Sequence, residues 1–115
     1  MNSILFSQSM DFAVEIIALT TRLRTEREFI ISPQIGRSGT SIGANIREAS
    51  FAQSRADFVS KLQIALKEAS ETGYWLELLF RTGSLSQQEY ERLDQLCTAL
   101  IKMLTASINT AKRSL

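Results

Sequence analysis

The sequence predicts an all-α fold, an antiparallel up-down four-helix bundle that associates with itself. The chain has one proline in 115 residues, and no stretch alternates β-branched with polar residues, so strands have little support. Four segments instead place their apolar residues three and four positions apart, which is the spacing of a helix with one buried face. Capping and turn residues separate these segments.

Length and composition are those of one globular domain, which we expect to span residues 1–115. Hydrophobic residues make up 44% of the chain and charged residues 22%, which is ordinary for a folded protein. The single cysteine, Cys97, excludes an intramolecular disulfide and favours a cytoplasmic location. The start of the chain lacks the pattern of a signal peptide, and the longest uncharged stretches are shorter than a membrane span, so we expect no membrane association.

The first helix is predicted over residues 7–23. Its apolar residues fall into two neighbouring stripes, Phe12, Ile16, Leu19 and Leu23 in one, and Met10, Val14 and Ile17 in the other. We therefore expect a wide face turned toward the core. The charged residues 24–31 are expected to form a loop or a frayed turn.

The second helix is predicted over residues 33–51, with Ser32 as its N-cap and Pro33 at its first position. Its bundle seam consists of Ile35, Gly39, Ile42, Ile46 and Ala49. Each glycine in this helix costs about 1 kcal/mol relative to alanine. Small residues in series therefore indicate either close approach of a neighbouring helix or a groove for a ligand or partner.

Three polar residues of this helix, Ser41, Asn45 and Glu48, are assigned structural roles. Asn45 lies beside the seam, so its amide needs hydrogen-bond partners if the bundle covers it. It is expected to fix the register of neighbouring helices. The alternative is a contact with a partner chain or with nucleic acid.

The third helix is predicted to be the longest, from a cap at Ser54, with Asp57 in near capping-box spacing, to a glycine stop at Gly83. Its core stripe is Phe58, Leu62, Ala65, Ala69, Thr72, Leu76 and Leu79. On the opposite side of the helix lie Ile64, Trp75 and Leu78, and Tyr74 extends this patch. Aromatic residues are enriched at interface centres, so the patch is a candidate oligomer interface; chance exposure is the alternative.

The fourth helix is predicted to begin at a capping box formed by Ser86 and Glu89. Its apolar stripe runs through Tyr90, Leu93, Cys97, Leu100, Leu104, Ile108 and Ala111. A free cysteine on such a stripe usually behaves as a small buried hydrophobic residue.

The residue types needed for catalysis are missing. The chain has no histidine and one cysteine, so zinc sites, di-iron sites and Cys-His or Ser-His nucleophiles are excluded. The glycines at 36, 39 and 43 have the spacing of neither a P-loop nor a dinucleotide fingerprint. We expect no enzyme activity, no cofactor and no metal site.

The charges are balanced overall but unevenly distributed. The chain has 13 basic and 12 acidic residues, too even a balance to indicate nucleic-acid binding by bulk charge. Residues 35–67 nevertheless carry five cations, Arg37, Arg47, Arg55, Lys61 and Lys67, against two anions. These five are candidate phosphate contacts. Contact between oppositely charged parts of neighbouring subunits explains the pattern equally well, and solvated helix faces are the simplest explanation.

Several segments together resemble the 23S rRNA intervening-sequence proteins, also called S23-type four-helix bundle proteins. They are residues 37–49 (RSGTSIGANIREA), 53–58 (QSRADF), 62–69 (LQIALKEA) and 74–79 (YWLELL). The family's central motif, Ser-Ile-Pro-x-Asn-Ile-x-Glu-Gly, is matched except that Gly43 replaces the proline and Ala49 the glycine. These departures affect any kink or close contact that the two residues would create.

The resemblance implies a four-helix bundle that assembles as a ring-shaped homopentamer, often encoded within insertions in large-subunit rRNA genes. Related bundle proteins act as accessory factors beside reverse transcriptases, and no enzyme activity is established for the family. Two hypotheses follow. The protein is an oligomeric adaptor that binds nucleic acid, most naturally RNA, or it is a protein-only assembly scaffold with a protein partner.

Overall fold

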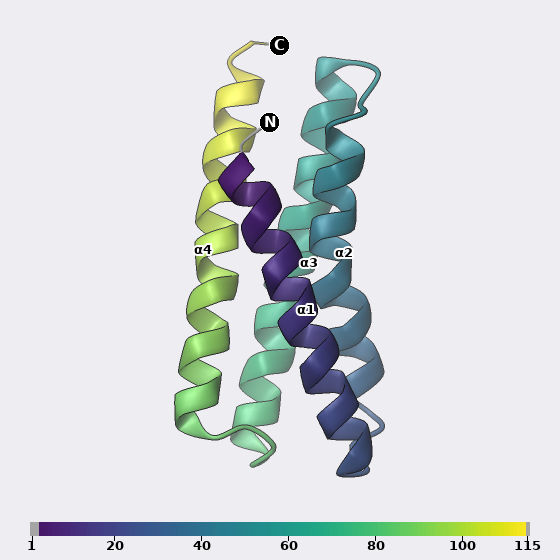
Figure 1. Cartoon of the computed structure of the whole chain (residues 1–115). Helices are drawn as coiled ribbons and strands as arrows, with labels where there is room; N and C mark the ends of the chain where they lie inside the picture. Colours follow the sequence, from purple (N-terminus) through teal and green to yellow (C-terminus); the bar gives the residue numbers. More distant parts are fainter. Residues whose placement is uncertain (1–2, 115) are drawn as a thin grey trace.

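The computed structural model describes residues 3–114, which form four α-helices and no strand. The helices are α1 (Ser3–Thr25), α2 (Ser32–Ala49), α3 (Arg55–Arg81) and α4 (Gln87–Lys112). In Figure 1 the chain runs down α1, up α2, down α3 and up α4. The helices pack into a rod of 46 × 21 × 19 Å, in which α1 and α3 each contact α2 and α4 but not one another. The prediction of an all-α fold with four helices is confirmed.

Helix α1 is longer than predicted at both ends, and its buried face is narrower. Its predicted first stripe is buried, and so are Leu5 and Ser9. Met10, Val14 and Ile17 are 51%, 62% and 53% exposed. The prediction of a wide inward face is therefore wrong. Because α1 packs against α2 and α4 from one side, it can bury only one stripe, which the Phe12 stripe already supplies.

By length and composition alone, α1 is also the one helix within residues 3–114 that is apolar enough to cross a membrane. Core helices of soluble proteins and signal sequences have the same composition, and 28% of its most apolar window is buried here.

The connection between α1 and α2 differs from the prediction in its capping. The helix ends where the backbone N–H of Glu28 donates to the carbonyl of Leu23 (2.8 Å), and Arg27 adopts a left-handed conformation with φ of 65°. Ser32 is the first residue of α2 and not its N-cap, which is Ile31. The carboxylate of Glu28 accepts from the backbone N–H groups of Ile31 and Ser32 at 2.8 and 2.6 Å. It satisfies the helix terminus in place of a capping hydroxyl.

The seam of α2 is buried as predicted, and one of its glycines brings α2 close to α1. All five seam residues are buried, and the four that carry apolar side chains are at most 2% exposed. A Cβ atom on Gly39 would lie 2.8 Å from Cγ2 of Ile16, nearer than side-chain carbons pack. Close approach of a neighbouring helix therefore explains this glycine.

The predicted ends of α3 and α4 are confirmed. The hydroxyl of Ser54 accepts from the N–H of Asp57 (3.0 Å), whose carboxylate accepts from the N–H of Gln53 (3.2 Å). At 27 residues α3 is the longest of the four, and Gly83 follows it with φ of 86°. The hydroxyl of Ser86 caps α4 by accepting from the N–H of Glu89 (3.1 Å).

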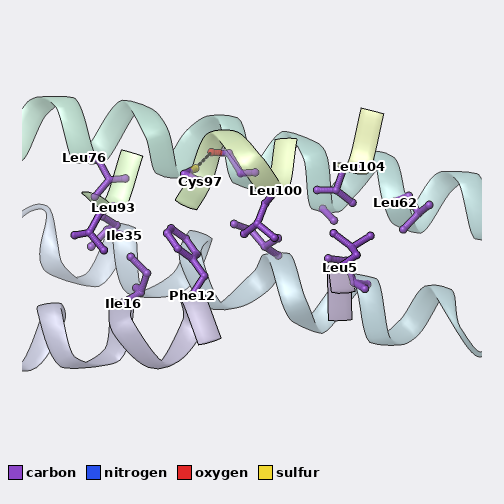
Figure 2. Packing of buried hydrophobic residues seen from close by; sticks show 14 of the residues in the cluster. Leu5, Phe12, Ile16, Ile35, Leu62, Leu76, Leu93, Cys97, Leu100 and Leu104 are labelled. Atoms are coloured by element: carbon purple, nitrogen blue, oxygen red, sulfur yellow. Dashed lines mark hydrogen bonds between the residues drawn. The ribbon is translucent and has the colours of Figure 1, made fainter. Parts of the chain in front are cut away.

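The core runs along the axis of the bundle, with side chains from all four helices (Figure 2). The predicted stripes of α3 and α4 are buried except for Phe58 and Tyr90, which are half-buried at its edge. Cys97 is buried, and its thiol donates to the carbonyl of Ala69 (3.2 Å). Burial raises the pKa of this thiol to about 12. The interpretation of Cys97 as a small buried hydrophobic residue is therefore confirmed.

Candidate interaction surfaces

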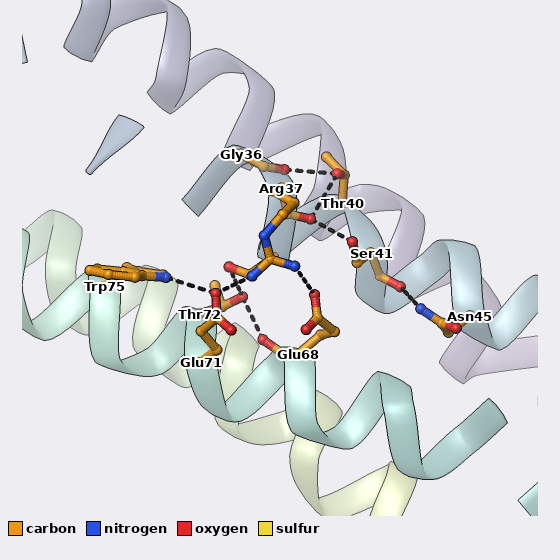
Figure 3. Close-up of polar contacts among 10 residues, drawn as sticks. Gly36, Arg37, Thr40, Ser41, Asn45, Glu68, Glu71, Thr72 and Trp75 are labelled. Carbon is orange, nitrogen blue, oxygen red and sulfur yellow. Dashed lines mark hydrogen bonds and ion pairs between the residues drawn. The ribbon is translucent and has the colours of Figure 1, made fainter. Parts of the chain in front are cut away.

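Arg37 is held within the subunit by two carboxylates of α3. Its guanidinium forms ion pairs with Glu68 (2.7 Å) and with Glu71 (Figure 3). Hydrogen bonding to Glu71 and then to Glu68 raises the pKa of Arg37. The indole N–H of Trp75 donates to Glu71 (3.1 Å), and this bond, followed by the one to Arg37, lowers the pKa of Glu71. The charge of Arg37 therefore stabilises the contact between α2 and α3.

The five cations predicted to contact phosphate are not brought together in one patch. Lys61 pairs with Glu48 at 3.5 Å, so it is occupied in the same way as Arg37. Arg47, Arg55 and Lys67 are exposed, and none of them forms an ion pair within residues 3–114. Arg47 and Arg55 flank the α2–α3 connection, whereas Lys67 lies near the middle of α3. Two of the five are thus neutralised within the chain and three remain free.

The patch predicted on α3 lies on the outer side of the bundle. Tyr74 is 60% and Ile64 41% exposed, whereas Trp75 and Leu78 are half-buried and pack against the core. The rings of Tyr74 and Trp75 meet edge to face, with centroids 5.0 Å apart. We call these four residues the α3 face. It exposes less apolar surface than the helical wheel predicts, because Trp75 is half-buried, with its indole N–H bonded to Glu71 one turn earlier on the same helix (Figure 3).

A second apolar surface, missed by the sequence reasoning, lies on α1. Met10, Val14 and Ile17, which we call the α1 face, are each more than half exposed. Beside them a groove of about 660 Å³ runs between α1 and α2. Its lining residues are Ser3, Phe6, Ser7, Ser9, Met10, Ala13, Thr40, Gly43, Ala44, Arg47 and Glu48. The four-three spacing of these three residues was a signal of a second seam, but it was assigned to the core.

The polar residues Ser41 and Asn45 make their hydrogen bonds within α2. The amide of Asn45 donates to the carbonyl of Ser41 (2.9 Å), and the hydroxyl of Ser41 donates to the carbonyl of Arg37 (2.6 Å). Glu48 does reach α3 through Lys61. The buried polar link between helices is a different one, between Ser38 and Thr72. The sequence suggested it only through a serine beside one seam and a threonine in another.

Within residues 3–114, no three side chains of the types that bind metals lie close enough together to hold an ion.

The chain is similar to proteins of one known family. Residues 1–106 match the family model described as 23S rRNA-intervening sequence protein. The chain is also similar to a crystal structure of a protein of unknown function from the S23 ribosomal protein family of Bacteroides thetaiotaomicron. The two are 52% identical with a TM-score of 0.91, over 93% of this chain and 96% of the other. Among curated proteins, none matches.

Proposed function

Because this chain belongs to the 23S rRNA-intervening sequence protein family, we propose that it acts without catalysis, as an antiparallel up-down bundle that assembles into a ring of identical subunits. The family resemblance implies five subunits. The supporting observation is a pair of apolar surfaces, the α1 face and the α3 face, on two helices that do not contact each other.

The placement of the two faces favours a ring over a two-fold dimer. Helices α1 and α3 lie diagonally across the bundle, with α1 in front and α3 behind in Figure 1. Both faces point away from the core, so they look to opposite sides of the subunit. If the α1 face of one subunit meets the α3 face of the next, the contact is heterologous and closes into a ring when the rotation allows.

The surfaces also have suitable chemistry for this contact. Tyr74 and Trp75 are the kind of rigid aromatic residues that anchor interfaces by filling pockets. The groove beside the α1 face offers such a pocket, lined mostly by small and apolar side chains. Joining the two surfaces removes from water seven apolar side chains that a single subunit leaves partly exposed.

Two charge insertions test the arrangement. Val14→Glu places a carboxylate on the α1 face, and Tyr74→Glu places one on the α3 face. By light scattering, the unaltered protein should have the mass of a multi-subunit ring and each variant the mass of one subunit. Each variant keeps one intact face, so an equimolar mixture should form a dimer through the single remaining interface.

The control is Ile30→Glu, at an 81% exposed position in the α1–α2 connection, away from both faces. It should leave the mass unchanged. An unaltered protein that is monomeric, or two variants that keep the parental mass, would rule out this assembly.

A second function, an RNA adaptor working in the cytoplasm, is supported by the free cations Arg47, Arg55 and Lys67. The family takes its name from intervening sequences of 23S rRNA, which makes RNA the ligand to test first. Cations without partners can replace the counterions of a phosphate backbone. The logarithm of the binding constant should therefore fall linearly with the logarithm of the salt concentration.

Fluorescence anisotropy of labelled RNA and duplex DNA, at low and at physiological salt, measures this binding. Arg47→Gln should weaken it and reduce the salt dependence, whereas Arg37→Gln should change it little, because Arg37 already pairs with Glu68 and Glu71. Binding that is absent or independent of salt would leave the protein-only scaffold as the function.

A further inference from the structure

The end of the bundle at which α2 connects to α3 carries two hollows that share a wall. In Figure 1 this connection and the C-terminal end of α4 lie at the same end of the molecule. One hollow, of about 390 Å³, is lined by Ala49, Ser50, Ala52, Ser54, Arg55 and Phe58. The other, of about 310 Å³, continues from Arg55 and Phe58 to Ala106, Ser107, Thr110, Ala111 and Ser114 of the α4 end. Together they form a track across the end of the bundle.

This track is basic in its surroundings. Arg55 is the one charged residue that lines it, and no carboxylate does. The two nearby acids are occupied, Glu48 by Lys61 and Asp57 by the backbone N–H of Gln53. Arg47, Lys112 and Arg113 stand exposed around the same end, and the part of the chain that the structure describes offers them no ion pair. Among the described side chains that line the track, Arg55 is therefore the charge that a bound anion would contact.

An exposed aromatic ring belongs to the same connection, because Phe51 stands in the chain between Ser50 and Ala52, which line the first hollow. Phe51, in the α2–α3 connection, is 81% exposed and packs against no other aromatic ring within residues 3–114. At the far end, the hydroxyls of Ser107 and Thr110 form no hydrogen bond with any described residue. Exposed aromatic rings on which bases stack, next to cations that follow the phosphates, are the combination by which proteins hold single-stranded nucleic acid.

We propose that this end of the bundle binds single-stranded RNA, with a base stacked on Phe51, phosphate at Arg55, and the Ser107 and Thr110 hydroxyls facing the sugar edge. The inference rests on the proposed RNA-adaptor function. It adds where the RNA binds and that the RNA is single-stranded. Stacking on Phe51 requires an exposed base face, which a duplex does not offer. An acidic peptide would satisfy the cations equally well, but the ring and the free hydroxyls suit a nucleotide better.

The experiment compares three labelled probes by anisotropy: an unstructured RNA of twelve nucleotides, the same RNA paired into a duplex, and a glutamate-rich peptide. Phe51→Ala should weaken binding of the single strand about 5- to 150-fold, as expected for loss of one stacked base, and should change duplex binding far less. Phe51→Trp should keep the affinity. Arg55→Gln should weaken binding and lower the salt slope by about 0.7, the value for one phosphate of a single strand.

Phe29→Ala is the matched control, since Phe29 is 63% exposed in the connection at the opposite end of the bundle, and it should have no effect. A direct readout of stacking comes from Phe51→Trp in a Trp75→Phe background, where RNA should quench the new indole. All these positions except Trp75 are surface residues, so the variants should fold.

The outcomes separate the two proposals. If the protein binds RNA with salt dependence but Phe51→Ala and Arg55→Gln bind as well as the parent, this site is wrong and the adaptor function stands. If no RNA binds at all, both are wrong. If the acidic peptide binds as tightly as the single strand and displaces it, the track is a peptide site and the proposal is overturned.

Discussion

The hydroxyl oxygens of Ser38 on α2 and Thr72 on α3 lie 2.8 Å apart in a hydrogen bond, and both side chains are completely buried. The Thr72 hydroxyl also lies 2.8 Å from the carbonyl of Glu68. Because the surrounding core is apolar, the Ser38 hydroxyl finds its partner on α3 only in one register of the two helices. Directly above it, Arg37 joins the same helices at the surface (Figure 3).

Thr72→Val should destabilise the protein by about 1–3 kcal/mol, because it keeps the side-chain shape but leaves a buried hydroxyl without its partner. Unfolding in urea at a fixed protein concentration measures this. Adding Ser38→Ala to Thr72→Val should cost less than the sum of the single changes. Strictly additive effects would show that the two hydroxyls do not interact.

Gly39→Ala should be destabilising by about 1–3 kcal/mol, as other overpacked core substitutions are. Its new methyl group would lie 2.8 Å from Cγ2 of Ile16. The matched control is Gly73→Ala in α3, where a Cβ would have no neighbour within 4 Å. That change should stabilise the protein by about 0.5–1 kcal/mol through helix propensity. Equal effects of the two substitutions in thermal unfolding would contradict the close contact between α1 and α2.

Alkaline pH should weaken the fold through Cys97. The folded-state pKa of its thiol is about 12, above the usual 9.0, so its contribution is fully present below pH 9 and is lost as the pH rises toward the folded value. Above pH 9 the unfolding free energy should fall by up to about 1.4 kcal/mol per pH unit from this group. Cys97→Ala should remove that part of the slope. A thiol reagent that labels the native protein quickly at pH 8 would contradict this burial.

Acid should release the contact between Trp75 and Glu71. The pKa of Glu71 is lowered from 4.5, so its stabilising contribution is present above that value and is lost as the pH falls through the lower folded one. The carboxylate is about a third exposed, and its effect on stability should be below about 1 kcal/mol. The fluorescence of Trp75, the only tryptophan, should follow the transition. Glu71→Gln should abolish it, and an unchanged titration in that variant would assign it to another group.

Most of the fold could be predicted from local patterns. The caps at Ser54 and Ser86 satisfy N–H groups three residues away, so residues adjacent in sequence determine them. The buried stripes of α2, α3 and α4 follow from helical periodicity, which needs no knowledge of the neighbouring helix. The capping of α2 was predicted wrongly because Glu28 reaches it across a turn whose path the sequence does not specify.

The candidate surfaces could be predicted only in part. The α3 face was found because a tryptophan lay opposite a complete core stripe. The α1 face was missed because Met10, Val14 and Ile17 are apolar and helically spaced, like core residues, and periodicity alone cannot say how many helices cover α1. Among the basic residues, Arg37 and Lys61 looked no different from Arg47 and Arg55, because their partners lie on another helix.

The sequence by itself therefore determined the four helices, the caps of α3 and α4 and most of the core, because these depend on spacing and on contacts within one turn. Only the tertiary structure decided which apolar stripe of α1 faces solvent, which cations are neutralised, and that Arg55 and the end of α4 lie together. Those properties depend on distances between helices, and these are set by how closely the backbones pack, as at Gly39 against Ile16.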